Sequence, residues 1–296
     1  MKKFVTFLLI TLFFIFVFSN IFSVDIYAQK PYELEMSFSY AYSSNNRLAV
    51  SGYSVIEVIN IGKLEVRKVR RNIFDTTFKF RYNFPTTNIE VSVPFKMRWD
   101  SIIKYADTTE EGEPTEEAYL AEGIGDIVIN VQTTVTQKES NQSNTRFNFG
   151  VKTTTGKNSY SDPDAEILFG SGHYGVKVGA SHFMQVDPVI LFGSLNYFWN
   201  IERDGYDPGD TTQYSIGMAY ALTQNFSINA RLEQSYTGHV YDQGGKVTGS
   251  SLNAASLNLG GSYITDNDVP IDFAVSTGLT EDAADFSIQV SRVYYF

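Results

Sequence analysis

The last segment of the chain, 286–296, alternates large apolar side chains with small polar ones. The apolar positions are Phe286, Ile288, Val290, Tyr294 and Phe296, and the polar positions between them include Ser287, Gln289 and Ser291. Because successive side chains of a β-strand point to opposite faces, this period of two predicts a strand with one apolar and one polar face. Arg292 departs from the pattern on the apolar face, where its long stem can reach lipid headgroups. The chain therefore ends on an amphipathic strand whose final residue is aromatic.

Similar runs recur along the whole sequence. We expect strands at 34–42, 74–84, 89–99, 127–135, 146–154, 174–184, 189–201, 214–222, 226–236, 255–263, 271–279 and 286–296. Tight turns alternate with long polar segments at 43–72, 101–122, 155–173 and 237–251. This rhythm, with a final strand that resembles the last strand of bacterial outer-membrane barrels, predicts an all-β fold: a transmembrane antiparallel β-barrel of about 12 strands. The barrel should be closed, because unpaired strand edges cannot lie in lipid.

The strand count is least certain in the segment 43–72. The stretches 55–62 and 64–71 could form an extra hairpin and give about 14 strands, or the segment could be a long loop folded against the lumen. Its basic cluster consists of Arg67, Lys68, Arg70 and Arg71, which places charge on both faces. A charge on the lipid face near the middle of the bilayer costs about 2–4 kcal/mol, which favours the loop.

The N-terminal segment is typical of an exported protein. A basic start at Met1 precedes the apolar stretch 4–18, and Ala28 before Gln29 ends a plausible cleavage site. We therefore expect a cleaved signal peptide at 1–28 and one outer-membrane barrel at 29–296. The alternative is a retained transmembrane helix, because weak apolar character continues toward the roughly 20 residues that span a bilayer. The absence of Cys excludes a lipid-modified cysteine and disulfides.

Charge and aromatic content bear on partners and location. The chain carries 23 basic and 33 acidic residues, a net charge of −10, which argues against a nucleic-acid partner. Its 19 Tyr and 23 Phe suit the aromatic girdles of a barrel, although they would suit any all-β protein. The expected location is the cell outer membrane. The expected partners are membrane lipid, lipopolysaccharide, a small-molecule permeant and the barrel-assembly machinery, which reads Tyr294 and Phe296.

Charged residues alternate along the inner face of the hairpin 74–99. They are Asp75, Lys79, Arg81, Glu90, Lys96 and Arg98. In the register that pairs Phe84 with Thr87, the residues opposite one another are Arg81 and Glu90, and Asp75 and Lys96. Later strands add further inward polar residues, such as Asn130, Arg146 and Arg231.

Two interpretations of these charges remain open. The ion pairs can simply brace a narrow lumen, since opposite charges across a strand pair stabilise a sheet. Alternatively, Lys79 and Arg98 remain unpaired, the hairpin has an excess of two positive charges, and this basic constriction gives a mild anion preference.

The strand 189–201 is apolar on both faces. Ile190, Phe192 and Phe198 face inward, and they alternate with an outward apolar set. They either pack against a loop in the lumen or contact an apolar permeant.

The acidic run and the histidines give weaker evidence for a functional site. The acidic run comprises Asp107, Glu110, Glu111, Glu113, Glu116, Glu117 and Glu122. It is either a solvated loop or a site that bridges to lipopolysaccharide through divalent cations. The three histidines are His173, His182 and His239, and none is spaced with an acid and a nucleophile in a catalytic pattern. We expect no enzyme, no cofactor and no metal.

Short motifs give a family resemblance. The run from Arg81 to Phe95 (RYNFPTTNIEVSVPF), the GIGD at 123–126 and the TTG at 154–156 resemble the outer-membrane barrel family labelled putative MetA-pathway of phenol degradation. The chain departs from the family at Thr154, where Pro is usual, and at Asn196, where Gly is usual. The resemblance implies a transporter barrel that passes small aromatic or apolar compounds, and it supplies no catalytic residues.

The expected function is a channel for small solutes. Eight strands leave a lumen filled by side chains, and sixteen to eighteen leave an open one, so a barrel of about 12 strands depends on how its loops fold. The competing class is a non-conducting structural or adhesive barrel that acts through its extracellular loops.

Overall fold

The protein is described by a computed structural model that covers residues 31–44, 67–104, 115–136, 143–162 and 167–296. The strands are β1 (Tyr32–Ser43), β2 (Arg67–Asn83), β3 (Thr87–Lys104), β4 (Thr115–Ile124), β5 (Val128–Thr136), β6 (Ser143–Lys152), β7 (Gly175–Val186), β8 (Val189–Asn200), β9 (Tyr206–Asp207), β10 (Thr211–Ala221), β11 (Phe226–Thr237), β12 (Tyr241–Asp242), β13 (Gly245–Lys246), β14 (Leu252–Ile264), β15 (Pro270–Gly278) and β16 (Phe286–Tyr295). The predicted signal peptide at 1–28 lies outside the described residues.

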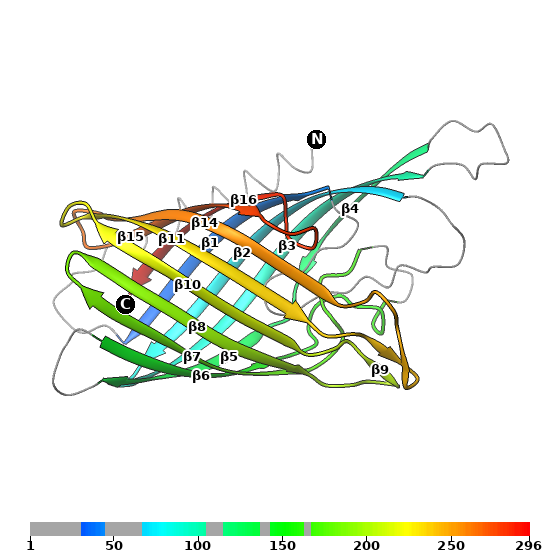
Figure 1. Ribbon diagram of the computed structural model, residues 1–296, viewed down its shortest axis with the longest axis horizontal. Helices are drawn as coiled ribbons and strands as arrows, with labels where there is room; N and C mark the ends of the chain where they lie inside the picture. Colours follow the sequence, from blue (N-terminus) through cyan, green and yellow to red (C-terminus); the bar gives the residue numbers. More distant parts are fainter. Residues whose placement is uncertain (1–30, 45–66, 105–114, 137–142, 163–166) are drawn as a thin grey trace.

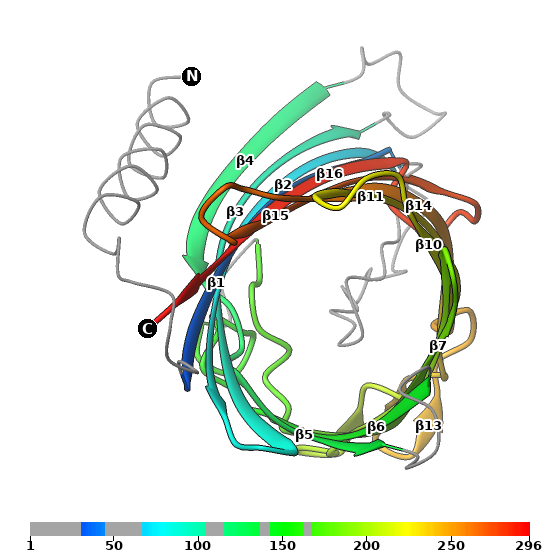
Figure 2. The ribbon, with the colours of Figure 1, turned by 90° about the vertical axis from the view of Figure 1, so that its left-hand side faces the viewer.

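Twelve of the described strands close into one antiparallel barrel, as the sequence predicts. The seam joins the two ends of the chain: β1 pairs with β16 along its length, and the amide of Phe296 donates to the carbonyl of Tyr32 at 2.9 Å. Figure 1 shows the tilted strands from the side, and Figure 2 shows the ring that they form from the end. Closure leaves the wall without an edge in lipid, which is what a membrane-spanning sheet requires.

The wall has an apolar outer face and a polar inner face. Outward side chains such as Phe80, Ile216 and Leu259 are about half exposed on this face. Inward positions carry mostly polar, charged or small residues, because the register keeps every second residue on the same side from strand to strand. Arg292 stays on the outer face opposite Met36, and its guanidinium carbon lies 4.9 Å from the ring centre of Tyr294.

The region around the end of β3 and the start of β2 differs from the prediction. Residues 67–72 belong to β2 rather than to a loop, β3 runs on to Lys104, and most of the strand β4 lies in the expected loop 101–122. In the described residues β4 pairs with β3 alone, and it flares away from the ring in Figure 2. A strand outside the closed wall needs no lipid-facing alternation, which is why the periodicity did not reveal it. The 14-strand alternative is wrong, and the stretch 55–62 lies outside the described residues.

The connections differ in length at the two ends, which fixes the orientation. Short turns at 84–86, 187–188, 222–225 and 265–269 lie at the end where β1 begins and β16 finishes, so this end is periplasmic. Longer segments lie at the other end, where β9, β12 and β13 form a small separate sheet. No helix of the described residues is long and apolar enough to cross a membrane.

One of the long segments folds into the barrel. After β6 ends at Lys152, the described parts of the segment 153–174 lie inside the ring in Figure 2 rather than beyond its rim. Ile167 and Phe169 are buried there, and Phe169 lies against Gly123 of β4. The lumen therefore contains a folded piece of the chain as well as the side chains of its wall.

Candidate functional site: the barrel lumen

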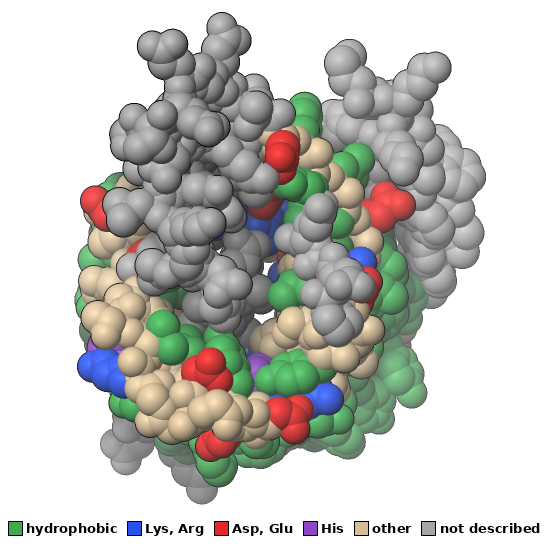
Figure 3. Space-filling model, turned by 90° about the vertical axis from the view of Figure 1, so that its right-hand side faces the viewer, with side chains coloured by type: hydrophobic (Ala, Val, Ile, Leu, Met, Phe, Trp, Pro, Cys, Tyr) green, Lys and Arg blue, Asp and Glu red, His purple; other side chains and the backbone are tan. Residues whose placement is uncertain are grey.

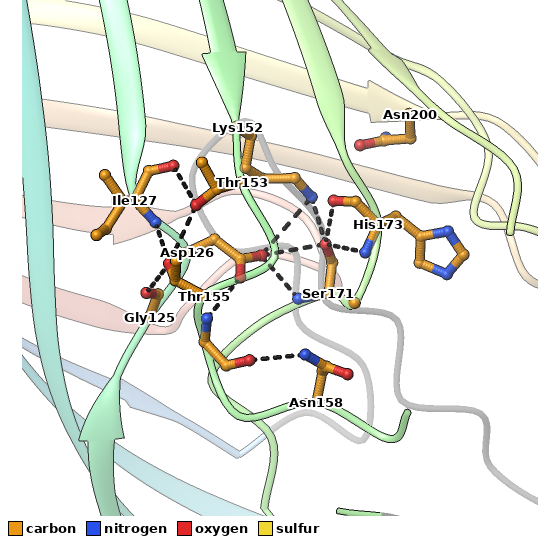
Figure 4. Close-up of polar contacts among 12 residues, drawn as sticks. Gly125, Asp126, Ile127, Lys152, Thr153, Thr155, Asn158, Ser171, His173 and Asn200 are labelled. Carbon is orange, nitrogen blue, oxygen red and sulfur yellow. Dashed lines mark hydrogen bonds and ion pairs between the residues drawn. The ribbon is translucent and has the colours of Figure 1, made fainter. Parts of the chain in front are cut away.

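Asp126 anchors the inward segment to the wall. It lies in the break between β4 and β5, where its carboxylate accepts hydrogen bonds from the amide of Gly156 at 3.0 Å and the amide of Ser171 at 2.9 Å. The hydroxyl of Ser171 donates to the same carboxylate at 3.2 Å. Figure 4 shows Asp126, Ser171 and Lys152 pointing toward one another. A single carboxylate thus holds both ends of the segment.

Lys152 completes this anchor from the end of β6. Its side chain is buried, with its ammonium 3.9 Å from the carboxylate of Asp126, and it donates a hydrogen bond to the hydroxyl of Ser171. A buried charge is costly unless it is paired and hydrogen-bonded, and this one is both. We call Asp126, Lys152, Gly156 and Ser171 the loop anchor.

Glycines make the anchor possible. A side-chain carbon added to Gly156 would lie 2.7 Å from the α-carbon of Gly170, so the two parts of the segment pass at backbone contact. The sequence motifs at 123–126 and 154–156, which contain Asp126 and Gly156, could be recognised from the sequence alone. Their role could not, because Asp126 and Ser171 are far apart in the chain.

His173 connects the inward segment to the extracellular loop 201–210. Its Nδ1 lies 3.0 Å from the carbonyl oxygen of Ile201, and its Nε2 lies 3.3 Å from the hydroxyl of Tyr160. The guanidinium carbon of Arg203 lies 4.1 Å from the ring centre of Tyr160, and Arg203 donates a hydrogen bond to the carbonyl of Gly172 at 3.1 Å. Burial lowers the pKa of His173 below its ordinary value, and the nearby positive charges act in the same direction. The ring is therefore neutral at neutral pH.

The predicted cross-strand ion pairs are confirmed. Arg81 Nε lies 2.7 Å from Glu90, and the ammonium of Lys96 lies 3.8 Å from Asp75. Arg81 also reaches two carboxylates of β1, Glu33 at 3.2 Å and Glu35 at 2.6 Å. It is the centre of a charged network near the periplasmic end of the wall.

The expectation that Lys79 and Arg98 remain unpaired is wrong. Lys79 lies 2.6 Å from Glu35, and Arg98 forms an ion pair with Asp100, which also lies 3.6 Å from Arg71. The sequence argument counted the hairpin 74–99 alone, and it left out both the acids of the neighbouring strand β1 and Asp100 at the next position of β3. The hairpin therefore has no free excess of two positive charges.

The inward apolar residues of β8 fall into two groups. Ile190 and Phe192 lie near the periplasmic end, where Phe192 is joined by Phe183 of β7 at a ring-centre distance of 6.3 Å. Phe198 lies near the other end, is 3% exposed, and has the ammonium of Lys177 5.5 Å from its ring centre. Only the first group faces open lumen. Sequence reasoning missed Phe183, although the strand 174–184 was expected.

The remaining predicted residues are dispersed. Tyr294 packs with Leu34 and Met36 on the outer face, and Phe296 packs against this cluster. Most of the acidic run lies outside the described residues, and Glu117 and Glu122 belong to β4. None of the three histidine rings hydrogen-bonds a serine hydroxyl within the described part of the chain. Figure 3 shows acidic and basic side chains around the extracellular mouth.

Comparisons with known proteins agree with this architecture. Residues 46–296 match the model of the family described as putative MetA-pathway of phenol degradation. The COG4313 outer membrane channel from Pseudomonas putida F1 superposes with a TM-score of 0.64 at 11% identity, over 93% of this chain and 100% of that chain. The toluene transporter TbuX from Ralstonia pickettii gives a TM-score of 0.46 at 10% identity, over 91% of this chain and 90% of that chain. The first of these structures has the same fold as this chain.

Proposed function

The chain belongs to the family described as putative MetA-pathway of phenol degradation, and from that premise we propose that it is an outer-membrane channel for small solutes, aromatic compounds among them. The observation that carries the proposal is a closed barrel with an apolar outer belt around a polar lumen. An apolar belt suits a lipid bilayer, and outer-membrane barrels have polar interiors of this kind.

The inward segment suits a narrow path. A barrel of this strand number encloses more space than its wall side chains fill, and the segment held by the loop anchor occupies part of that space. Apolar residues face the lumen near one end and charged residues line the facing wall. Small solutes are therefore the class that fits such a path.

Planar-bilayer recordings and liposome uptake test the channel. We expect discrete single-channel currents, and uptake of small solutes into liposomes that contain folded, heat-modifiable protein. Empty liposomes and liposomes with heat-unfolded protein are the controls. Folded protein that gives neither current nor uptake would overturn the channel and favour a structural or adhesive barrel.

The partners of this proposal are those of an outer-membrane protein. They are membrane lipid, lipopolysaccharide at the outer leaflet, the barrel-assembly machinery and the permeant. We place the assembly signal at Tyr294 and Phe296, and the wall of the constriction at the charged network around Arg81.

A further inference from the structure

Arg146 is a lumen cation whose neighbours in the wall are neutral. It lies near the periplasmic end of β6, and its inward neighbours across the strands are Thr134 and Ser181. Its side chain is exposed, and no carboxylate of the described residues forms an ion pair with it. A guanidinium that lines a narrow lumen attracts anions when no acid of the wall neutralises it.

Aromatic rings lie beside this cation in a fixed arrangement. The guanidinium carbon of Arg146 lies 4.9 Å from the ring centre of Phe183, and the rings of Phe183 and Phe192 are inclined by 33°. Phe192 fits over Gly217 of β10, where an added side-chain carbon would lie 2.5 Å from the ring. Gly217 therefore sets the position of Phe192, and Phe183 sets that of Arg146.

The apolar part of this patch is open to the lumen. Ile190 is 40% exposed, and its inward neighbour on β10 is Ala219. The small side chain of Ala219 leaves space beside Ile190 that a larger residue would fill.

We propose that Arg146, Phe183, Ile190 and Phe192 bind a small aromatic compound that carries a carboxylate. The inference rests on the proposed function and names the substrate class. A guanidinium whose face lies on an aromatic ring keeps its N–H edge available for a bidentate contact with a carboxylate. The aromatic ring of the permeant packs against Phe192 and Ile190 in an offset or edge-to-face geometry.

The other cations of the lumen suit this role less well. Lys79 and Arg81 of β2 are matched by Glu35 and its neighbours. Lys177 lies over Phe198, which is buried.

Equilibrium binding tests the inference without requiring conduction. Calorimetric titration of the folded, detergent-solubilised barrel compares benzoate with phenol, which lacks the carboxylate, and with acetate, which lacks the ring. We expect benzoate to bind about tenfold more tightly than either, the effect of about 1.4 kcal/mol. Arg146→Gln should abolish the advantage over phenol, and Phe192→Leu the advantage over acetate.

The matched control is Arg231→Gln on β11, another inward arginine, whose guanidinium lies 3.3 Å from Glu233. It should leave benzoate affinity unchanged, and heat-modifiability checks that each variant is folded. If benzoate binds no better than phenol and acetate, or if Arg146→Gln binds it normally, the inference is wrong even where the barrel conducts. Benzoate binding by a barrel that passes no solute would instead retain the site and remove the channel.

Discussion

At the scale of single residues, a few buried polar groups decide how the lumen is filled. Asp126 contacts both ends of the inward segment, and Lys152 supports it from β6. Among its other contacts, the side-chain amide of Asn158 donates to the carbonyl of Gly156 at 2.7 Å, and Arg203 donates one hydrogen bond to the carbonyl of Gly172 at 3.1 Å. Hydrogen bonds to charged groups are the stronger class, so the carboxylate should dominate the anchoring.

Replacing Asp126 with Ala should therefore release the segment. The substitution removes three hydrogen bonds and the ion pair with the buried ammonium of Lys152, a loss of about 3 kcal/mol. Limited proteolysis within 155–174 should become faster, and single-channel conductance should rise. Asp162→Asn is the control, because its ion pair with Lys157 at 2.9 Å is exposed. Unchanged proteolysis in Asp126→Ala would show that other contacts hold the segment.

His173 should make the same segment sensitive to acid. Its pKa is lowered mainly by burial, so its folded-state value lies below its unfolded value of about 6.5. The stability that His173 contributes to the segment is therefore fully present above about pH 6.5. It is lost as the pH falls below that value, because the unfolded state binds the proton first. The groups around the ring are Tyr160, Tyr206, Lys152, Arg203 and Asp207.

Hydrogen exchange measures this effect. After correction for intrinsic rates, amides at 170–173 should exchange faster at pH 5 than at pH 7.5 in the wild type, whereas His173→Gln should show no such difference. The control is His182→Gln, at an outward position beside Thr145. Equal acid sensitivity in His173→Gln would assign the effect to another group.

At the scale of elements, the meaning of a charged strand depends on its neighbours. The hairpin of β2 and β3 carries an excess of basic residues on its inner face, but β1 adds Glu33 and Glu35 to it. The pairing of β1 with β2 places these acids beside Arg81 and Lys79. The charges of this wall are therefore balanced, and we expect its contribution to ion selectivity to be small.

Neutralising the acids of β1 should expose the hidden positive charge. In the double variant Glu33→Gln, Glu35→Gln, Lys79 loses its carboxylate partner and Arg81 keeps only Glu90. Reversal potentials in a salt gradient should shift toward anion preference. The control, Asp272→Asn, removes an inward acid of β15 that forms no ion pair with Lys79 or Arg81. An unchanged reversal potential would place the selectivity-determining charges outside this network.

At the scale of the whole molecule, the two ends of the chain close the barrel. β16 pairs with both β1 and β15, so the last strand to be synthesised completes the wall. The terminal aromatic residues have two separable roles. Their backbone closes the seam, and we propose that their side chains are read during assembly.

Two variants separate these roles. Removing Tyr294, Tyr295 and Phe296 deletes pairing with β1 and should abolish the heat-modifiable form both in cells and after refolding in detergent. Phe296→Ala keeps the backbone, so it should refold in detergent but assemble poorly in cells. Ala substitution at outward Ile288 in the same strand is the control. Normal cellular assembly of Phe296→Ala would remove the side chain from the assembly signal.

The sequence by itself determined the class of fold, because period-two alternation is a local property that each strand carries within its own residues. It fixed the closed barrel, the inward and outward faces, and the pairs of Arg81 with Glu90 and Asp75 with Lys96, since a tight turn sets the register of its own hairpin. Only the tertiary structure decided the partners of Lys79, the additional strand β4 and the loop anchor at Asp126. Lys79 meets Glu35 through the pairing of β1 with β2, β4 pairs with β3 outside the closed wall, and the anchor joins Asp126 to Ser171, 45 positions later. No periodicity within a single segment encodes these contacts.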